Sequence, residues 1–344
     1  MARDTGRSTL VDIAAEAGVS VSAVSKVLNG RTDVAAATRA RIAALLRENG
    51  YQVASRLGFG VVDLLIANLH SPWAEELLQG TVQAADESGA SVVVSTVDSP
   101  AQFTRWLDRA ADRGTDGALC VLQLPDSSEL QRLAAARIPL VVIDPPEEPG
   151  AGIRSVGTTN WQGGLAATRH LIELGHCRIG IIAGPERLWS SRARLAGYRA
   201  ALQAAGLPAP AELVRGSDDF CLDEGRRQGG HLLDLPDPPT AIVAGNDSQA
   251  FGVLQALAER GLRAPADLSV TGFDDVPVAT WATPALTTIR QPLAAMAATA
   301  FRMLRSGPGG RASEPQHIEL ATTLVVRDST APPSRRGSRE PAGT

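Results

Sequence analysis

The segment that decides the fold of the first fifty residues is Thr9-Leu10-Val11-Asp12-Ile13-Ala14-Ala15-Glu16-Ala17-Gly18-Val19-Ser20-Val21-Ser22-Ala23-Val24-Ser25-Lys26-Val27-Leu28-Asn29. Its first half repeats apolar residues at the spacing of one helical face. Gly18 is expected to end that helix, because a residue without Cβ adopts left-handed backbone at little cost. Ser20 is placed to cap a second helix. Two short helices joined by a glycine turn form a helix-turn-helix, whose second helix can lie in a DNA major groove.

A third amphipathic segment, from Thr38 to Asn49, completes a small three-helix core. Its inward positions are Ile42, Leu45 and Leu46, and its outward positions are Arg39, Arg41 and Arg47. The face of the second helix that we expect to be buried consists of Ala23, Val24, Val27 and Leu28. The structural alternative is a three-helix bundle without a role in DNA binding.

The polar positions of this segment carry a family resemblance. The run D-I-A-x-x-A-G-V-S-x-x-x-V-S-K-V-L-N, starting at Asp12, and the run T-R-x-R-I…N-G-Y, starting at Thr38, resemble the headpiece of the lactose-repressor (LacI/GalR) family of bacterial transcription regulators. About fifteen constrained positions coincide in register, so the match is specific. The resemblance implies a homodimer that binds a palindromic, double-stranded operator DNA.

The resemblance also assigns the residues that contact DNA. Val21 and Ser22 occupy the base-selecting pair of the family, and Lys26 its Arg/Lys position. Lys26 can donate to guanine O6 and N7, whereas Val21 can contact only an apolar group such as a thymine methyl. Lys26 is the only lysine among 33 basic residues, which favours this role over that of a solvated surface charge. Ser25 is a further exposed position on this helix, and Ser20, Asn29 and Thr38 are placed for phosphate contacts.

Residues 51–60 are a shortened linker. In the family that the chain resembles, this segment usually holds a Pro-Asn pair and a short hinge helix, and a leucine wedges into the minor groove. Here the Pro-Asn pair is missing. Leu57 is the candidate wedge, which would kink the duplex. A plain glycine-containing tether is the alternative, and the sequence leaves the two open.

Composition and charge limit the remaining possibilities. The 344 residues are enough for two or three domains. Residues 1–60 carry eight basic and five acidic side chains, a net charge of +3 in a chain of net −4, so the remainder carries −7. A basic head on an acidic body suits DNA at one end. No apolar run reaches eighteen residues, which excludes a membrane span, and we expect no membrane partner. Three unpaired cysteines and no secretory segment favour a cytoplasmic, nucleoid-associated protein.

From Val61 onward, short apolar runs alternate with amphipathic helices, the pattern of a parallel sheet covered by helices on both faces. The pattern restarts near Trp161, which predicts two doubly wound lobes with a cleft between them. This body, 61–329, resembles the periplasmic-binding-protein-like effector domain of the same family, so the fold class is α/β with a three-helix headpiece. The expected divisions are a headpiece at 8–50, an N-lobe at 61–158 and 291–320, a C-lobe at 159–288 and 321–329, and a disordered tail at 330–344. A single strand is expected at Glu319–Val326.

Motif matches to the family place polar and aromatic residues at the strand ends that face the cleft. A guanidinium, carboxylates and amides around an apolar plate suit neighbouring sugar hydroxyls, because each hydroxyl needs a donor and an acceptor. Some of these residues could instead be helix caps or ion pairs, and Asp247 in particular could cap a helix. The expected effector-binding residues in this group are Asp144, Arg194, Phe220, Asn246, Asp274 and Gln291.

Tryptophan placement adds a second group of candidates. Trp106 is expected in the core, on a helix. The other four, Trp73, Trp161, Trp189 and Trp281, fall in loops or at helix starts near the cleft. Aromatic faces stack on the C–H faces of pyranose rings. Several tryptophans around one cleft favour a di- or oligosaccharide.

The leading hypothesis is therefore a repressor of carbohydrate-utilisation genes that leaves its operator when a sugar binds. A purine corepressor is the alternative ligand, and a sugar-binding protein serving transport is the alternative class. An enzyme is disfavoured, because the Asp218-Asp219 and Asp274-Asp275 pairs lack an accompanying nucleophile–histidine pair. We expect neither a cofactor nor a bound metal, since the sequence has no metal-ligand cluster and no phosphate-cradling glycine loop.

Overall fold

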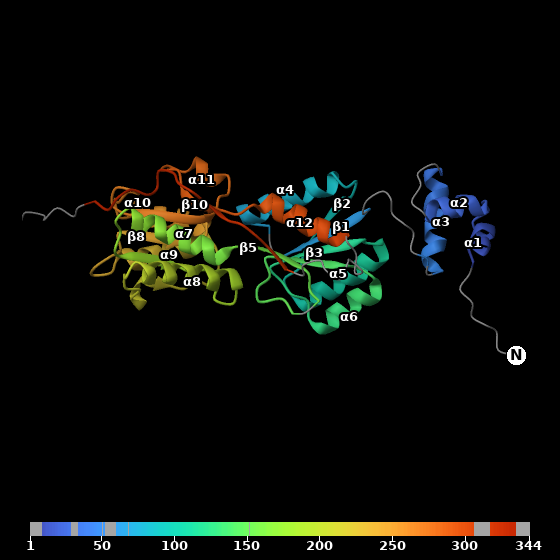
Figure 1. Cartoon of the computed structure of the whole chain (residues 1–344), viewed down its shortest axis with the longest axis horizontal. Coiled ribbons are helices and arrows are strands. Elements are labelled where there is room, and N and C mark those ends of the chain that lie inside the picture. The colour runs from blue at the N-terminus through green and yellow to red at the C-terminus, as the bar shows by residue number, and fades with distance from the viewer. Residues whose placement is uncertain are drawn as a thin grey trace, which may run out of the picture.

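The computed structural model describes residues 9–28, 34–49, 51, 60–67, 69–150, 152–305 and 317–334. It contains a three-helix headpiece and two α/β lobes, as Figure 1 shows. Both the helix-turn-helix and the doubly wound lobes that the sequence predicts are confirmed. No helix within the described ranges is long and apolar enough to cross a membrane.

The headpiece helices are α1 (Leu10–Glu16), α2 (Val21–Leu28) and α3 (Ala36–Glu48). Thr9 and Asp12 form a capping box at the start of α1. Gly18 has the expected left-handed backbone, with a φ of +61°. The Ser20 hydroxyl accepts the Ala23 backbone N–H at 3.2 Å, as a cap of α2. The buried core consists of Ile13, Ala14, Ala17, Val24, Val27, Ile42 and Leu46. Leu45, expected inside, is only half-buried.

The N-lobe contains a six-stranded parallel sheet of order β11-β5-β4-β3-β1-β2. Two buried clusters lie on its faces, one under α4 and α12 and the other under α5 and α6. Trp106 is in the second cluster, as expected, and its indole N–H donates to Asp63 at 3.0 Å. The strands are β1 (Val61–Ile66), β2 (Ser91–Thr96), β3 (Gly117–Val121), β4 (Leu140–Ile143), β5 (Ser155–Thr158) and β11 (His317–Leu320), and the helices α4 (Pro72–Asp86), α5 (Pro100–Arg113), α6 (Ser127–Ala136) and α12 (Leu293–Arg305).

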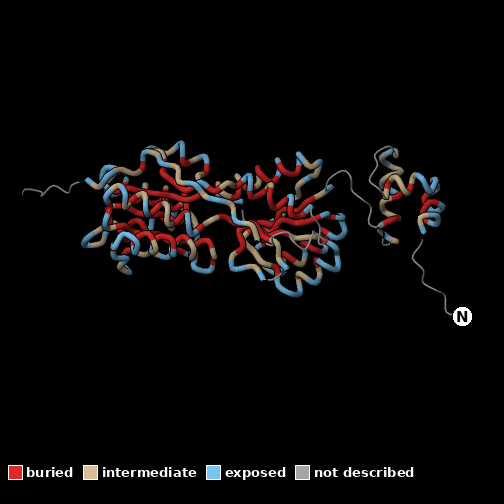
Figure 2. The backbone as a smooth tube through the Cα atoms, in the orientation of Figure 1, coloured by how far each residue is buried: buried red, intermediate tan, exposed pale blue. Residues whose placement is uncertain are grey.

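The C-lobe repeats this plan with the sheet order β12-β10-β9-β8-β6-β7. All its neighbours are parallel except β12, which runs antiparallel to β10. In Figure 2 the buried residues, drawn in red, are concentrated along the strands of the two sheets. The strands are β6 (Ile179–Ile182), β7 (Val214–Arg215), β8 (Ala241–Ala244), β9 (Ser269–Asp274), β10 (Thr287–Arg290) and β12 (Thr323–Val325), and the helices α7 (Asn160–Glu173), α8 (Trp189–Ala204), η1 (Ala211–Leu213), α9 (Leu222–Leu233), α10 (Asp247–Ala258) and α11 (Val278–Trp281).

Glycines allow the C-lobe helices to pack closely in pairs. A Cβ on Gly197 of α8 would lie 2.1 Å from the Trp161 carbonyl oxygen, and one on Gly164 of α7 would lie 2.3 Å from the Arg194 carbonyl oxygen. Neither position has room for a side chain, since the obstacle is backbone. The approach of α8 to α7 sets the position of Arg194.

The chain passes between the lobes three times. The crossings follow β5, β10 and β11. The expected single strand Glu319–Val326 is wrong: β11 pairs in the N-lobe, β12 pairs in the C-lobe, and the two residues between them carry the chain across.

A disordered tail was expected to begin at residue 330, and this expectation is wrong for Thr330 and Ala331. The Thr330 hydroxyl contacts His170 Nε2 at 2.9 Å, and the Ala331 backbone N–H donates to the Ser269 hydroxyl at 3.0 Å. These contacts hold the segment through Ala331 against the C-lobe. Residues 335–344 lie outside the described residues.

Candidate functional site

A cavity of about 1200 Å³ lies between the two lobes, at the carboxyl ends of their strands. Parallel sheets bind ligands at this edge. Six of the ten sequence-predicted effector residues line it: Trp73, Asp144, Arg194, Phe220, Asn246 and Asp274. Trp73 and Asp144 come from the N-lobe and the others from the C-lobe, so a ligand in the cavity would contact both.

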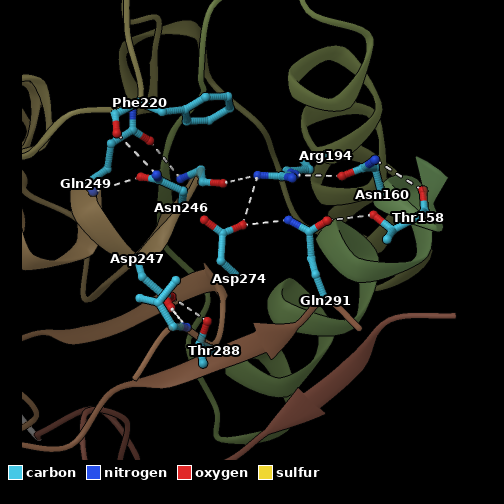
Figure 3. A network of polar contacts seen from close by, with 12 residues as sticks. Thr158, Asn160, Arg194, Phe220, Asn246, Asp247, Gln249, Asp274, Thr288 and Gln291 are labelled. Atoms are coloured by element: carbon cyan, nitrogen blue, oxygen red, sulfur yellow. Dashed lines mark hydrogen bonds and ion pairs between the residues drawn. The ribbon is translucent and has the colours of Figure 1, made fainter. Parts of the chain in front are cut away.

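Arg194 lies in the middle of the polar network drawn in Figure 3 and lines the cavity. Its side chain is buried, and its Nε donates to Asn160 Oδ1 at 2.8 Å while a terminal nitrogen donates to the Gly245 carbonyl at 2.7 Å. The guanidinium carbon lies 3.7 Å from the centre of the Phe273 ring. A planar guanidinium held by two acceptors and an aromatic face has a fixed orientation.

Asp274 is held by Gln291 from behind. Gln291 Nε2 donates to Asp274 Oδ1 at 2.6 Å, and the Thr158 hydroxyl donates to Gln291 Oε1 at 2.9 Å. Asp274 Oδ1 is also 4.0 Å from a terminal nitrogen of Arg194. Gln291 itself is buried and does not line the cavity, so the structure makes it a support for Asp274 where a direct effector contact was expected.

Asn246 is the residue that caps α10. Its Oδ1 accepts the Gln249 backbone N–H at 2.9 Å, and its Nδ2 donates to the Phe220 carbonyl at 3.2 Å. The expectation that Asp247 could be this cap is wrong, because the Asp247 carboxylate accepts bonds from the Thr288 hydroxyl and the Val276 backbone N–H. Asn246 therefore both caps α10 and holds the Phe220 backbone in place.

The two carboxyl groups of the cavity come from opposite lobes. Asp144 follows β4 with a φ of +49°, and Asp274 ends β9 with a φ of +122°, both unusual for residues with a side chain. Burial raises the pKa of Asp144 to about 6, against the effect of the Arg194 charge. Burial also raises the pKa of Asp274, and Arg194 and the Gln291 bond offset part of that rise. Both groups can exchange a proton near neutral pH.

The remaining tryptophans do not line this cavity. Trp161 and Trp189 line a second pocket of about 600 Å³, which shares Asp144 and Ser190 with the first. Trp281 is 74% exposed at the end of α11 and lines neither pocket, so the prediction that it faces the cleft is wrong.

Several polar groups of the site were not singled out from the sequence. Asn160 orients Arg194, and Asp98 and Gln123 line the N-lobe wall after β2 and β3. A usable signal existed for the last two, since each follows a strand at the edge where ligands bind. Asn160 follows β5, a strand that was not predicted. No group of three or more His, Cys, Asp or Glu side chains that could hold a metal occurs in the described part of the chain.

The headpiece presents the start of α2 to solvent. Val21 is 42% exposed and Ser22 is also exposed, consistent with the base-selecting pair, while Ser20 is used as the cap. Ser25, Lys26 and Thr38 are half-buried. Asn29 and Leu57 lie outside the described residues. The choice between a wedge and a plain tether therefore stays open.

A helix-turn-helix headpiece joined to a two-lobed body with an interlobe cavity is the architecture of a DNA-binding transcriptional regulator. Residues 9–53 match the family described as bacterial regulatory proteins, lacI family, and residues 168–330 match the periplasmic binding protein-like domain. The regulator DegA of Bacillus subtilis is 32% identical over 95% of this chain and 99% of its own length. The repressor PurR of Escherichia coli is 34% identical over 94% of this chain and 97% of its own.

Solved structures agree with these relatives. A complex of the transcriptional regulator CelR with cellobiose is 34% identical, with a TM-score of 0.71 over 94% of this chain and all of that one. The lac repressor dimer bound to operator and the anti-inducer ONPF is 29% identical, with a TM-score of 0.71 over 95% of this chain and all of that one. The chain belongs to the LacI family of bacterial transcriptional regulators. Its relatives are DNA-binding regulators, and this finding argues against the alternatives of an enzyme and of a transport protein.

Proposed function

We propose that this regulator is a homodimeric repressor of carbohydrate-utilisation genes whose interlobe cavity binds a sugar, and that the bound sugar releases the operator. The observation that carries the proposal is the placement of Arg194 with carboxyl groups from both lobes, Asp144 and Asp274, in one buried cavity. We propose DNA contacts to bases from Val21, Ser22 and Lys26, with Ser25 on the same helix. We propose phosphate contacts from Ser20, Asn29 and Thr38, and a minor-groove contact from Leu57.

The chemistry of this set favours neighbouring hydroxyls. A carboxylate accepts a hydroxyl proton, and a guanidinium donates to the hydroxyl oxygen. Phe220, 5.5 Å from the Arg194 guanidinium, and Trp73 on the opposite lobe supply apolar surface for the C–H faces of a sugar ring. Because the donors and acceptors are fixed by Asn160, Gly245 and Gln291, little order must be created on binding.

Ligand binding can change the affinity for DNA only if the ligand binds one arrangement of the two lobes more tightly than another. A sugar that contacts Asp144 and Arg194 together favours the arrangement in which the lobes lie close. The affinity difference between the two arrangements limits how far the operator affinity can change. In a dimer, the same change alters the spacing of the two headpieces relative to the half-sites.

The test is operator binding with and without sugar. An operator is selected from random duplexes with the full chain, and its binding is followed by fluorescence anisotropy at fixed salt. We expect a saccharide from a panel of gluco-, xylo- and malto-series mono- and disaccharides to lower operator affinity at least tenfold. A protein that selects no DNA sequence, or that binds its operator equally with every saccharide, would contradict the proposal.

A purine corepressor is the second candidate. It is favoured by the aromatic side chains Phe220, Trp73 and Phe251 in the cavity wall, which could stack on a flat base, and by the likeness to PurR. The two candidates change operator affinity in opposite directions: we expect the sugar to lower it and a purine corepressor to raise it. Adenine, guanine and hypoxanthine in the same anisotropy experiment separate them.

A further inference from the structure

The second pocket lies where the chain crosses between the lobes. Its wall is formed by the segment 157–162, the start of α8 and strand β11. It shares Asp144 and Ser190 with the main cavity, so these two side chains form a wall that is common to both spaces. A ligand that contacts Asp144 in the main cavity is therefore at the boundary of the second pocket.

One wall of the second pocket is a fixed aromatic surface. The rings of Trp189 and His317 lie 5.6 Å apart with a tilt of 31°. The Trp189 backbone N–H donates across the lobes to the Pro146 carbonyl at 2.6 Å, and His317 Nδ1 is bonded to the Ser155 hydroxyl at 2.8 Å. The first bond fixes the Trp189 backbone, and the second fixes the His317 ring.

The opposite side of the pocket combines an exposed aromatic ring with charged groups. Trp161, in the first turn of α7, is 41% exposed although it is a large apolar side chain. Glu148, Arg192 and Glu319 are exposed side chains that supply acceptors and a donor around the pocket. Aromatic surface with such groups at its rim is suited to a sugar ring, which is apolar on its faces and polar at its edge.

The dimensions also favour a ligand longer than one ring. Small-molecule sites usually measure about 300–1,000 Å³. The main cavity, at about 1200 Å³, is above that range, and the second pocket adds about 600 Å³. The carboxylates Glu148 and Glu319 disfavour an anionic ligand in the second pocket, and Arg192 beside them offers a hydrogen-bond donor to an uncharged one.

We propose that the Trp161–Trp189 pocket is a second sugar subsite, and that the effector is an uncharged oligosaccharide of two or more pyranose units that runs from the main cavity past Asp144 into this pocket. The inference rests on the proposed sugar-releasing function and adds the length and direction of the ligand. Trp161 acts as a stacking residue of the second unit. Arg194 and Asp274 bind the first.

The test compares saccharides of increasing length by titration calorimetry on the full chain. The probes are glucose, cellobiose and cellotriose, together with the xylose and maltose series. We expect one series to gain at least tenfold in affinity from the mono- to the disaccharide. In Trp161→Ala that gain falls to threefold or less while the monosaccharide affinity is retained, and Trp161→Phe restores most of it.

Trp281→Ala is the matched control, because Trp281 is more exposed than Trp161 and lines neither pocket. Equal affinities of mono- and disaccharide overturn the subsite, as does a Trp161→Ala variant with the full gain, or two independent monosaccharide sites. In each of those cases the sugar still binds and the proposed function stands. Binding of no saccharide in the panel overturns the proposed function itself, and the subsite with it.

Discussion

At the scale of single residues, burial decides what each cavity group does. Arg194 has no freedom to turn toward water, because Asn160, Gly245 and Phe273 hold it from three sides. Asp144 and Asp274 reach the cavity on backbone with positive φ, which costs of order 1–3 kcal/mol per residue and persists only where the surroundings enforce it. The site is preorganised at the expense of folding stability.

Replacement of Arg194 by lysine tests this fixed orientation. Lysine keeps the charge but cannot donate in one plane to Asn160 Oδ1 and the Gly245 carbonyl. Without that orientation the side chain loses a charge-assisted hydrogen bond to the sugar, which is worth about 1.5–3 kcal/mol, so we expect saccharide affinity to fall about 10- to 100-fold in calorimetry. Arg199→Lys, at an exposed position of the same helix, is the control. An Arg194→Lys variant with the affinity of the parent would show that the fork geometry is not used.

Asp144 makes the ligand-free protein sensitive to pH. Its folded pKa of about 6 exceeds the unfolded value of 3.8, so the folded state binds the proton more tightly. The free energy of unfolding therefore falls as pH rises from 3.8 to about 6, by about 2–3 kcal/mol from this group. In urea unfolding between pH 4.5 and 8, Asp144→Asn should lose this part of the decline and be more stable than the parent at pH 7.

The control for this experiment is Asp86→Asn, at an exposed position near the end of α4. It should follow the parent protein at every pH. Asp274 has a raised pKa for the same reason, so the Asp144→Asn variant should keep part of the decline. A variant whose stability follows the parent curve unchanged would mean that Asp144 is already solvated in solution.

At the scale of elements, the sequence predicted most helices and strands, because their apolar spacing is local information. It did not predict the division of Glu319–Val326, since a chain that changes sheets while staying extended needs neither glycine nor proline there. It also named Asp247 as the possible cap of α10, whereas the cap is Asn246. Both side chains can cap, and the choice depends on Thr288 and Val276, which the fold brings to Asp247.

The close approach of α7 and α8 gives an element-scale prediction. In Gly197→Ala the new Cβ meets backbone, 2.1 Å from the Trp161 carbonyl oxygen and 2.7 Å from the Leu165 nitrogen, so one helix must move. We expect the free energy of unfolding to drop by about 3 kcal/mol or more, the upper part of the range for overpacked cores. Gly216→Ala, with no atom within 4 Å of its Cβ, should change it by about 0.5 kcal/mol or less. Equal urea midpoints for the two variants would contradict this packing.

At the scale of the whole molecule, the sequence predicted the two-lobed plan, and six of the ten effector residues that it predicted line the cavity, because strand ends in a parallel sheet share an edge. It could not show which tryptophans reach the ligand. Trp161, Trp189 and Trp281 all lie near helix ends, and only the packing of the lobes places two of them in one pocket and leaves the third on the surface.

Operator recognition belongs to this scale, because it requires the dimer and the full chain. If Lys26 contacts a guanine, Lys26→Ala should cost about 1–3 kcal/mol of operator affinity and relax the preference at one base position in each half-site. Anisotropy with single-base operator variants at constant salt measures both effects. Arg263→Ala, an exposed C-lobe position with the same loss of charge, is the control. A uniform loss on all sequences would instead assign Lys26 to a phosphate.

The last two strands, β11 and β12, are the outer strands of the two sheets and are only two residues apart in the chain. Neither lobe can therefore complete its sheet until the chain has been translated through these two strands. A nonsense mutation between residues 291 and 316 leaves β5 and β10 as bare edges, which are sites of aggregation. Such a truncated product would be cleared by proteolysis and would not persist as a constitutive operator binder.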